Sequence, residues 1–92
     1  MDILEARFGE VIWLLNQLVF SNTAQRLAQV LLQRRRLEED DTLTVTHEAL
    51  SRDLGTAREM VTRLLDRFQQ DGMVALSRGN IRILDEKRLQ EL

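Results

Sequence analysis

The residue types with the clearest chemical potential lie together in the middle of the chain. Arg58, Glu59 and Arg63 have a spacing that places two guanidinium groups and a carboxylate on one polar side of a helix. An arginine can donate two hydrogen bonds to guanine O6 and N7, and a glutamate can accept one from the cytosine N4 amino group. Thr62, between them, can touch a thymine methyl group or a phosphate. We therefore expect this stretch to read base edges in a DNA major groove.

The same residues also fit a simpler interpretation. Glu59 and Arg63 are four residues apart, and such a pair commonly forms an ion pair on an ordinary solvated helix face. The four residues alone leave both interpretations open. The choice between them depends on the helices and strands predicted around these residues.

The apolar pattern predicts two helices that meet at a glycine. Thr46 has the chemistry of an N-cap for a helix that runs through Leu54, and Gly55 supplies the backbone freedom that a sharp turn needs. Ser51 is small enough for a close helix contact. The second helix is expected at about 57–71. Its inner stripe has the spacing i, i+3, i+4 and i+7 and consists of Val61, Leu64, Leu65 and Phe68.

Short strands flank this pair of helices. Residues 42–46 alternate β-branched and apolar side chains and predict one strand, and residues 74–77 and 81–83 predict a hairpin that turns at Arg78-Gly79-Asn80. Asp85 is expected to cap a last short helix at 86–91. Two helices joined at a glycine and followed by a hairpin are typical of a winged helix-turn-helix. The predicted fold class is mainly α with a small β-hairpin wing.

The first part of the chain predicts an amphipathic helix over residues 2–20. Ser21-Asn22-Thr23 interrupts its pattern, and Asn22 with Gln25 resembles a capping box that starts a second helix. We therefore divide the chain into an N-terminal helix at 1–21 and a winged helix-turn-helix domain at 22–92. The N-terminal helix carries so much apolar surface that it is either a dimer interface or buried in its own domain.

A run of three arginines, Arg34-Arg35-Arg36, precedes an acidic stretch at 38–41. The run is either a phosphate-binding patch or a solvated helix end beside a flexible loop, and we favour the second interpretation because cations are common at helix C-termini.

Composition limits the possible functions. The chain has 92 residues, 43% of them apolar, with no cysteine and one histidine, His47. This suits one small domain and offers no disulfide or thiolate metal site, and we expect no metal, no cofactor and no enzyme. His47 is expected to face solvent.

The apolar run at 11–15 is far shorter than the about 20 residues of a membrane span. We expect no membrane partner and a cytoplasmic location, since no targeting segment is apparent.

The distribution of charge favours a binding face in the second half of the chain. The formal net charge is −2, whereas residues 46–83 hold six arginines and five acidic residues, a net of +1. The acidic surplus therefore lies outside the predicted helix-turn-helix, and a single copy is expected to bind DNA with modest affinity.

From residue 22 to residue 92 the chain closely resembles the DNA-binding domain of the Crp/Fnr family of bacterial regulators. The motifs that carry the resemblance are Arg26-Leu27-Ala28, Thr46-His47-Glu48-x-Leu50, Leu54-Gly55-Thr56, Arg58-Glu59-x-Val61-x-Arg63-Leu64-Leu65, Phe68-x-x-x-Gly72-Met73 and Ser77-Arg78-Gly79-x-Ile81-x-Ile83-Leu84-Asp85. They appear in the family's order over about three quarters of the chain.

The resemblance implies a sequence-specific transcription regulator that binds double-stranded DNA. Its base-reading positions match Arg58, Glu59 and Arg63, with Thr62 beside them, and half-sites in the family have TGTGA-like or TTGAT-like cores. The DNA backbone is expected to be contacted by Thr56, Arg67 and Arg78. One departure is Ala57, which stands where the family often has serine. We therefore expect Thr56 to cap the recognition helix.

The resemblance also implies a homodimer formed through residues 2–20. Members of the family carry a sensor domain before this segment, and we favour a piece of a longer regulator over a regulator that lacks a sensor. A second hypothesis is a winged-helix module that binds a protein, such as RNA polymerase or a longer homologue, which the acidic net charge would suit.

Overall fold

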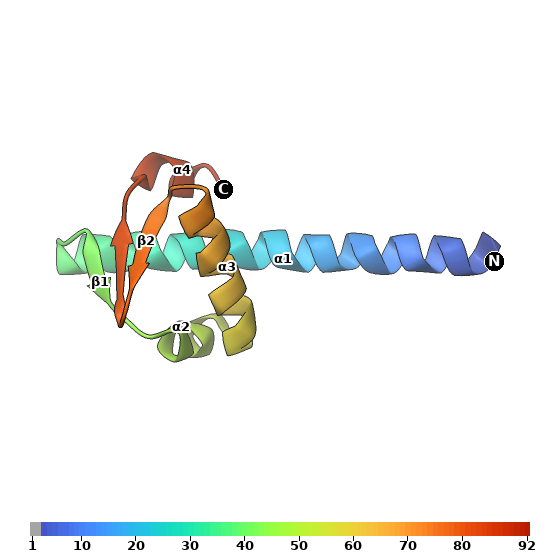
Figure 1. Ribbon diagram of the computed structural model, residues 1–92, viewed down its shortest axis with the longest axis horizontal. Helices are drawn as coiled ribbons and strands as arrows, with labels where there is room; N and C mark the ends of the chain where they lie inside the picture. The colour runs from blue at the N-terminus through green and yellow to red at the C-terminus, as the bar shows by residue number, and fades with distance from the viewer. Residues whose placement is uncertain (1–2) are drawn as a thin grey trace.

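The computed structural model describes the backbone of residues 3–92 and the side chains from residue 8 onwards. Its longest element is α1 (Ile3–Glu38), one continuous helix of 36 residues (Figure 1). At 1.5 Å per residue such a helix is about 54 Å long. The molecule measures 55 × 24 × 19 Å, so its long dimension is the length of α1.

The break that we predicted at residues 21–23 is wrong. The helix passes through Ser21, Asn22 and Thr23, and the capping box of Asn22 and Gln25 does not form. The hydroxyl of Thr23 instead donates to the carbonyl oxygen of Val19, 2.8 Å away, while Ser21 and Asn22 lie exposed on the helix surface. A polar side chain inside a helix can satisfy itself in this way, so three polar residues did not end α1.

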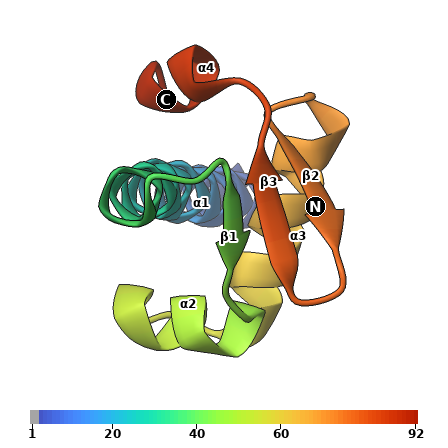
Figure 2. The ribbon, with the colours of Figure 1, turned by 90° about the vertical axis from the view of Figure 1, so that its left-hand side faces the viewer.

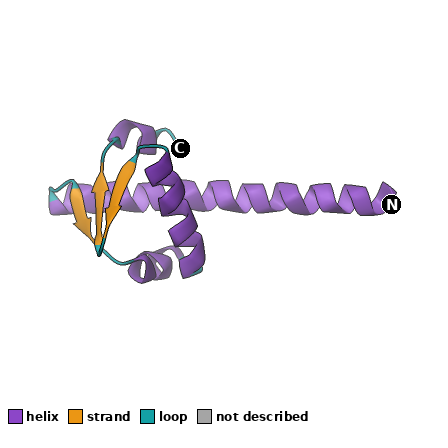
Figure 3. Cartoon of the chain, viewed as in Figure 1, coloured by secondary structure: helices purple, strands orange, loops and turns teal. Residues whose placement is uncertain are grey.

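Three further helices follow: α2 (His47–Leu54), α3 (Arg58–Gln70) and α4 (Glu86–Gln90) (Figure 3). Two predicted caps are confirmed. The Thr46 side chain accepts from the Ala49 amide at 3.0 Å, and the Asp85 side chain accepts from the Arg88 amide at 3.1 Å. Gly55 ends α2 in the left-handed region, with φ of 66°. The two central helices therefore meet at the predicted turn.

The strands form one antiparallel sheet of β1 (Thr42–Thr44), β2 (Val74–Ser77) and β3 (Asn80–Ile83). Figure 2, which looks along α1, shows β3 between β1 and β2. Ile81 pairs with Leu43 on one side and with Leu76 on the other. The hairpin is confirmed, and the early strand is two residues shorter than predicted and completes the wing as its third strand.

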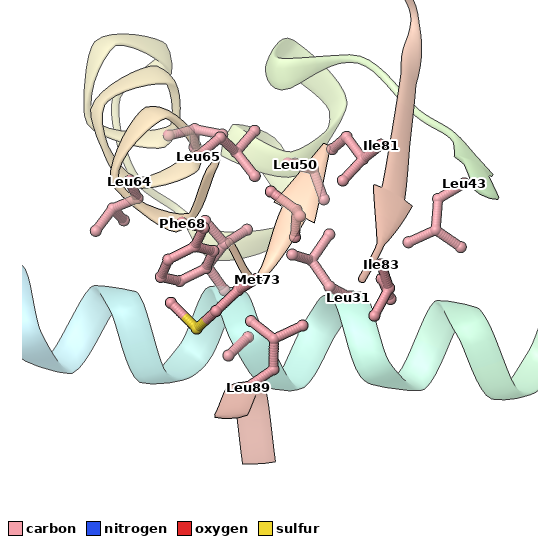
Figure 4. Packing of buried hydrophobic residues seen from close by; sticks show 14 of the residues in the cluster. Leu31, Leu43, Leu50, Leu64, Leu65, Phe68, Met73, Ile81, Ile83 and Leu89 are labelled. Carbon is pink, nitrogen blue, oxygen red and sulfur yellow. The ribbon is translucent and has the colours of Figure 1, made fainter. Parts of the chain in front are cut away.

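The core lies between α1, α3 and the sheet. Residue Ala24 is the first apolar residue of α1 in the core, and Leu27, Leu31 and Leu32 follow on the same side. Figure 4 shows Phe68 of α3, Met73 and Leu89 of α4 close to one another beside α1. The predicted inner stripe of α3, Val61, Leu64, Leu65 and Phe68, is fully or almost fully buried. Because burial of such a side chain stabilises the fold by roughly 1.5–3 kcal/mol, this stripe fixes which side of α3 faces outwards.

Two of the three arginines at the end of α1 connect it to other elements. Arg34 forms an ion pair with Asp53 of α2 at 2.6 Å. Arg35 pairs with Asp41 at 2.7 Å and with Glu86 of α4 at 3.1 Å. The run lies at the end of α1, as predicted, but Arg34 and Arg35 are half-buried and pair with carboxylates from other parts of the fold. Of the three, only Arg36 is largely exposed.

The first half of α1 stands clear of the rest of the domain (Figure 1). Eight large apolar side chains there are between 43% and 70% exposed, namely Phe8, Val11, Ile12, Trp13, Leu14, Leu15, Leu18 and Val19. Contact with the core begins only at Phe20, which is partly buried against it. These side chains, from Phe8 to Val19, are therefore not covered by their own domain.

Candidate nucleic-acid interface

The outward side of α3 brings together the three residues expected to read bases. Arg58, Glu59 and Arg63 are exposed, on the side opposite the buried stripe. Within the described part of the chain, none of their side chains takes part in a hydrogen bond or an ion pair. In particular, Glu59 and Arg63 do not pair with each other in the described structure, so the ion pair of the simpler interpretation is absent and the helix face is solvated. Two cationic groups and one anionic group are thus available to a ligand.

Thr62 occupies a different position from its neighbours. It is half-buried, and its hydroxyl oxygen lies 3.0 Å from Nδ1 of His47, the first residue of α2. His47 is also half-buried, so besides its exposed part it makes a contact with α3 that the sequence did not indicate. No sequence pattern signals this contact, because it joins residues 15 positions apart on two different helices.

The N-terminus of α3 lacks a capping side chain. Its N-cap is Ala57, in extended conformation and without a side-chain hydrogen bond, so the prediction that Thr56 caps this helix is wrong. The Thr56 amide instead donates to the carbonyl oxygen of Ser51 at 3.0 Å, which makes Thr56 part of the end of α2. The amides of Arg58 and Glu59 have no acceptor among residues 3–92. Amides at such a helix end favour an anionic ligand.

A hollow separates the start of α3 from the wing. It has a volume of about 460 Å³ and is lined by His47, Arg58, Arg78 and Asn80 among others. Arg78 is exposed at the tip of the hairpin, beside Gly79 with φ of 76°. The structure therefore places Arg58 and Arg78 at one concave surface.

Arg67 lies one helical turn beyond Arg63 and is exposed. Its Nε is 3.3 Å from Oδ2 of Asp71, an ion pair on the helix surface. Because surface pairs of this kind are weak, Arg67 retains the ability to exchange its partner for a phosphate. It also borders a second hollow, between α1 and α3, which Phe20 and Leu64 help to line.

The geometry of α3, packed on one side and open and polar on the other, agrees with what a comparison with known protein families shows. Residues 25–92 match the model of the Crp-like helix-turn-helix domain. The chain belongs to this family. The Crp-like domain is a DNA-binding domain of transcription regulators, so both the resemblance noted in the sequence and the predicted winged helix-turn-helix are confirmed.

Individual relatives support the assignment to the Crp-like family. The cyclic AMP receptor protein of Thermus thermophilus is 29% identical over 90 residues, which are 98% of this chain and 42% of that protein. The crystal structure of the Thermus thermophilus catabolite activator protein has a TM-score of 0.89 at 29% identity, over 97% of this chain and 42% of that one. A Crp/Fnr-family protein from Eubacterium rectale is 41% identical, with a TM-score of 0.74, over 97% and 43% of the two chains.

The chain thus spans less than half the length of these relatives. The part of the chain that matches the family model, residues 25–92, is the DNA-binding domain, which belongs to a class of regulators and not of enzymes. Among the helices described, none is both long and apolar enough to cross a membrane.

Proposed function

We propose that this Crp-like chain recognises a specific DNA sequence by placing the first turns of α3 in the major groove. Arg58, Glu59 and Arg63 then read base edges, and Thr62 adds an apolar contact. The observation that carries the proposal is the open face of α3, where these three charged groups are exposed and have no partner in the described structure. Charged side chains aimed outwards from a braced helix are what direct readout of bases requires.

The proposed target is a half-site that contains TG. Arginine prefers guanine because its two parallel donors match O6 and N7, and glutamate accepts from cytosine on the partner strand. The resemblance to the Crp/Fnr family points to the same half-site. Around this reading surface, Thr56, Arg67 and Arg78 are the proposed contacts to the DNA backbone. The two open amides at the start of α3 suit a phosphate oxygen.

We further propose that two copies pair through residues 2–20. Phe8, Ile12, Leu15 and Val19 follow the alternating four- and three-residue spacing of a coiled-coil seam and are 43% to 70% exposed. A monomer rarely leaves such a continuous apolar surface uncovered. A two-fold dimer then presents two copies of α3 to half-sites about 34 Å apart, one turn of DNA.

Fluorescence anisotropy with labelled duplexes tests the proposal. The full chain is titrated into a palindrome of two TG-containing half-sites and into a scrambled duplex of the same composition, at two salt concentrations. We expect the palindrome to bind at least about 1000-fold more tightly, the lower end of the range for specific sites. Equal affinity for both duplexes would contradict sequence recognition.

The same preparation addresses the second hypothesis. A protein-binding module would show no DNA shift even at low salt and would retain a stoichiometric partner, for example RNA polymerase or a longer homologue. That combination of results would replace the DNA-binding proposal for this chain.

A further inference from the structure

The hydrogen bond between His47 and Thr62 joins the two helices of the DNA-binding unit. His47 Nδ1 lies 3.0 Å from Thr62 Oγ1, and both residues are half-buried. Thr62 is three residues after Glu59 and directly before Arg63, so it sits among the proposed base-reading residues. His47 belongs to α2 and has no place in that set.

This bond restricts the side chain of Thr62. A threonine in a helix usually divides between two χ1 rotamers, because its hydroxyl can also bond a carbonyl of the preceding turn. Here the hydroxyl bonds the imidazole of α2. Whichever tautomer His47 adopts, the Thr62 hydroxyl either donates to Nδ1 or accepts from it, so the hydroxyl points towards α2. The other group on the Thr62 Cβ atom, its methyl group, is then left to face away from the imidazole.

We infer that His47 is a positioning residue for base recognition: it holds the Thr62 hydroxyl towards α2, so that Thr62 presents its methyl group to the major groove and selects thymine at one position. The inference rests on the proposed function, since it assumes that α3 reads DNA. An apolar contact with the thymine C5-methyl group is the readout that a threonine methyl provides.

The bond is not needed to hold α2 against α3. Leu50, Leu54, Val61 and Leu65 are buried between or beneath these helices at 3% exposure or less, and Ser51 is buried as well. A half-buried neutral hydrogen bond adds only about 1 kcal/mol to this packing. Its main effect is therefore on the orientation of the Thr62 side chain, which lies on the proposed reading surface.

Selection from a randomised half-site library tests the inference with four variants of the full chain. Thr62→Val loses the bond to His47 but has a methyl group on both branches, so one of them faces the groove without the bond, and it should keep the thymine preference. Thr62→Ser keeps the hydroxyl and its bond to His47 but loses the methyl group. It should lower the preference about fourfold, the factor that burial of one methyl group provides. His47→Ala releases the hydroxyl and should flatten the preference at that same position, leaving the positions read by Arg63 unchanged.

His47→Asn is the matched control, since its Oδ1 is the same number of bonds from the backbone as the Nδ1 of histidine. It should restore most of the thymine preference, which a merely structural role of His47 would not predict. Thermal unfolding of each variant shows that it is folded.

The inference is overturned if His47→Ala keeps the wild-type base preferences, if it weakens all sequences equally, or if Thr62→Ser retains the thymine preference. In all three cases a wild-type chain that still enriches a defined site leaves the proposed function standing. A wild-type chain that enriches no sequence ends the proposed function and the inference together.

Discussion

The guanidinium group of Arg26 in α1 donates a hydrogen bond to the backbone carbonyl oxygen of Leu54, with 2.5 Å between Nη2 and the oxygen. Leu54 is the last residue of α2, just before the turn into α3. Carbonyl groups at the end of a helix lack partners within it, so this arginine supplies one from 28 residues away. The long helix is thereby tied directly to the turn that orients the reading helix.

Loss of this contact should weaken the fold. Arg26→Ala is expected to lower the free energy of unfolding by about 1 kcal/mol, because a hydrogen bond from a charged donor is lost at a partly exposed site. Urea denaturation followed by circular dichroism measures the change. Arg36→Ala is the control, since Arg36 is exposed and its side chain has no partner in the described structure. Equal stability of the two variants would show that the bond contributes nothing.

Arg63 and Arg78 should affect DNA binding in different ways. Arg63→Ala is expected to relax base preference at one position, at a cost of about 1–3 kcal/mol for the preferred site only. Arg78→Ala should weaken binding to all sequences alike. It should also lower the slope of log K against log salt concentration by about 1 per subunit, the value for one lost phosphate contact. Titrations against single-base variants of the site at several salt concentrations separate the two effects. If both substitutions caused the same uniform loss, the division into base and backbone contacts would be refuted.

The turn between α2 and α3 should be sensitive to its glycine. Gly55 has φ of 66°, and a Cβ placed there would meet no atom within 4 Å, so a substitution is strained by its backbone alone. Gly55→Ala should therefore lower stability by about 1–2 kcal/mol. Gly55→Asn should cost less, since asparagine tolerates the left-handed region. Thermal denaturation gives the order of stability of the three proteins. An alanine variant as stable as the asparagine variant would contradict the explanation.

The first half of α1 should control the oligomeric state. Leu15→Glu places a charge within the proposed seam, where Leu15 is 52% exposed, and is expected to convert a dimer to a monomer. Leu37→Glu is a matched control near the other end of the same helix, where Leu37 is 77% exposed. Sedimentation velocity measures both. A wild-type chain that sediments as a monomer, or equal effects of the two substitutions, would rule out pairing through this segment.

Local patterns were sufficient to predict most of the elements. The buried stripe from Val61 to Phe68, the cap at Thr46 and the turn at Gly55 each follow from the chemistry of a few neighbouring residues. The outward direction of Arg58, Glu59 and Arg63 then follows from the burial of the stripe, because a helix has only one other side.

Features that depend on which of several partners a polar group or a strand finds were not predicted. The continuity of α1 depends on the Thr23 hydroxyl bonding the Val19 carbonyl within the helix. The strand at 42–46 was predicted, but its partner was not, because Leu43 pairs with Ile81 far along the chain. Thr56 was expected to cap α3, but its amide belongs to the end of α2. The contact of His47 with Thr62 appears only when two helices are packed together.

Because α1 is unbroken, the spacing of the proposed DNA contacts would depend on residues far from them in the chain. If one helix of a paired dimer slipped by a single heptad against the other, its α3 would move by about 10 Å along the helix axis. Neighbouring half-sites are only about 34 Å apart, so a dimer in the shifted register would miss one of them. Substitutions between Phe8 and Val19 can therefore abolish operator binding without touching any residue near the DNA.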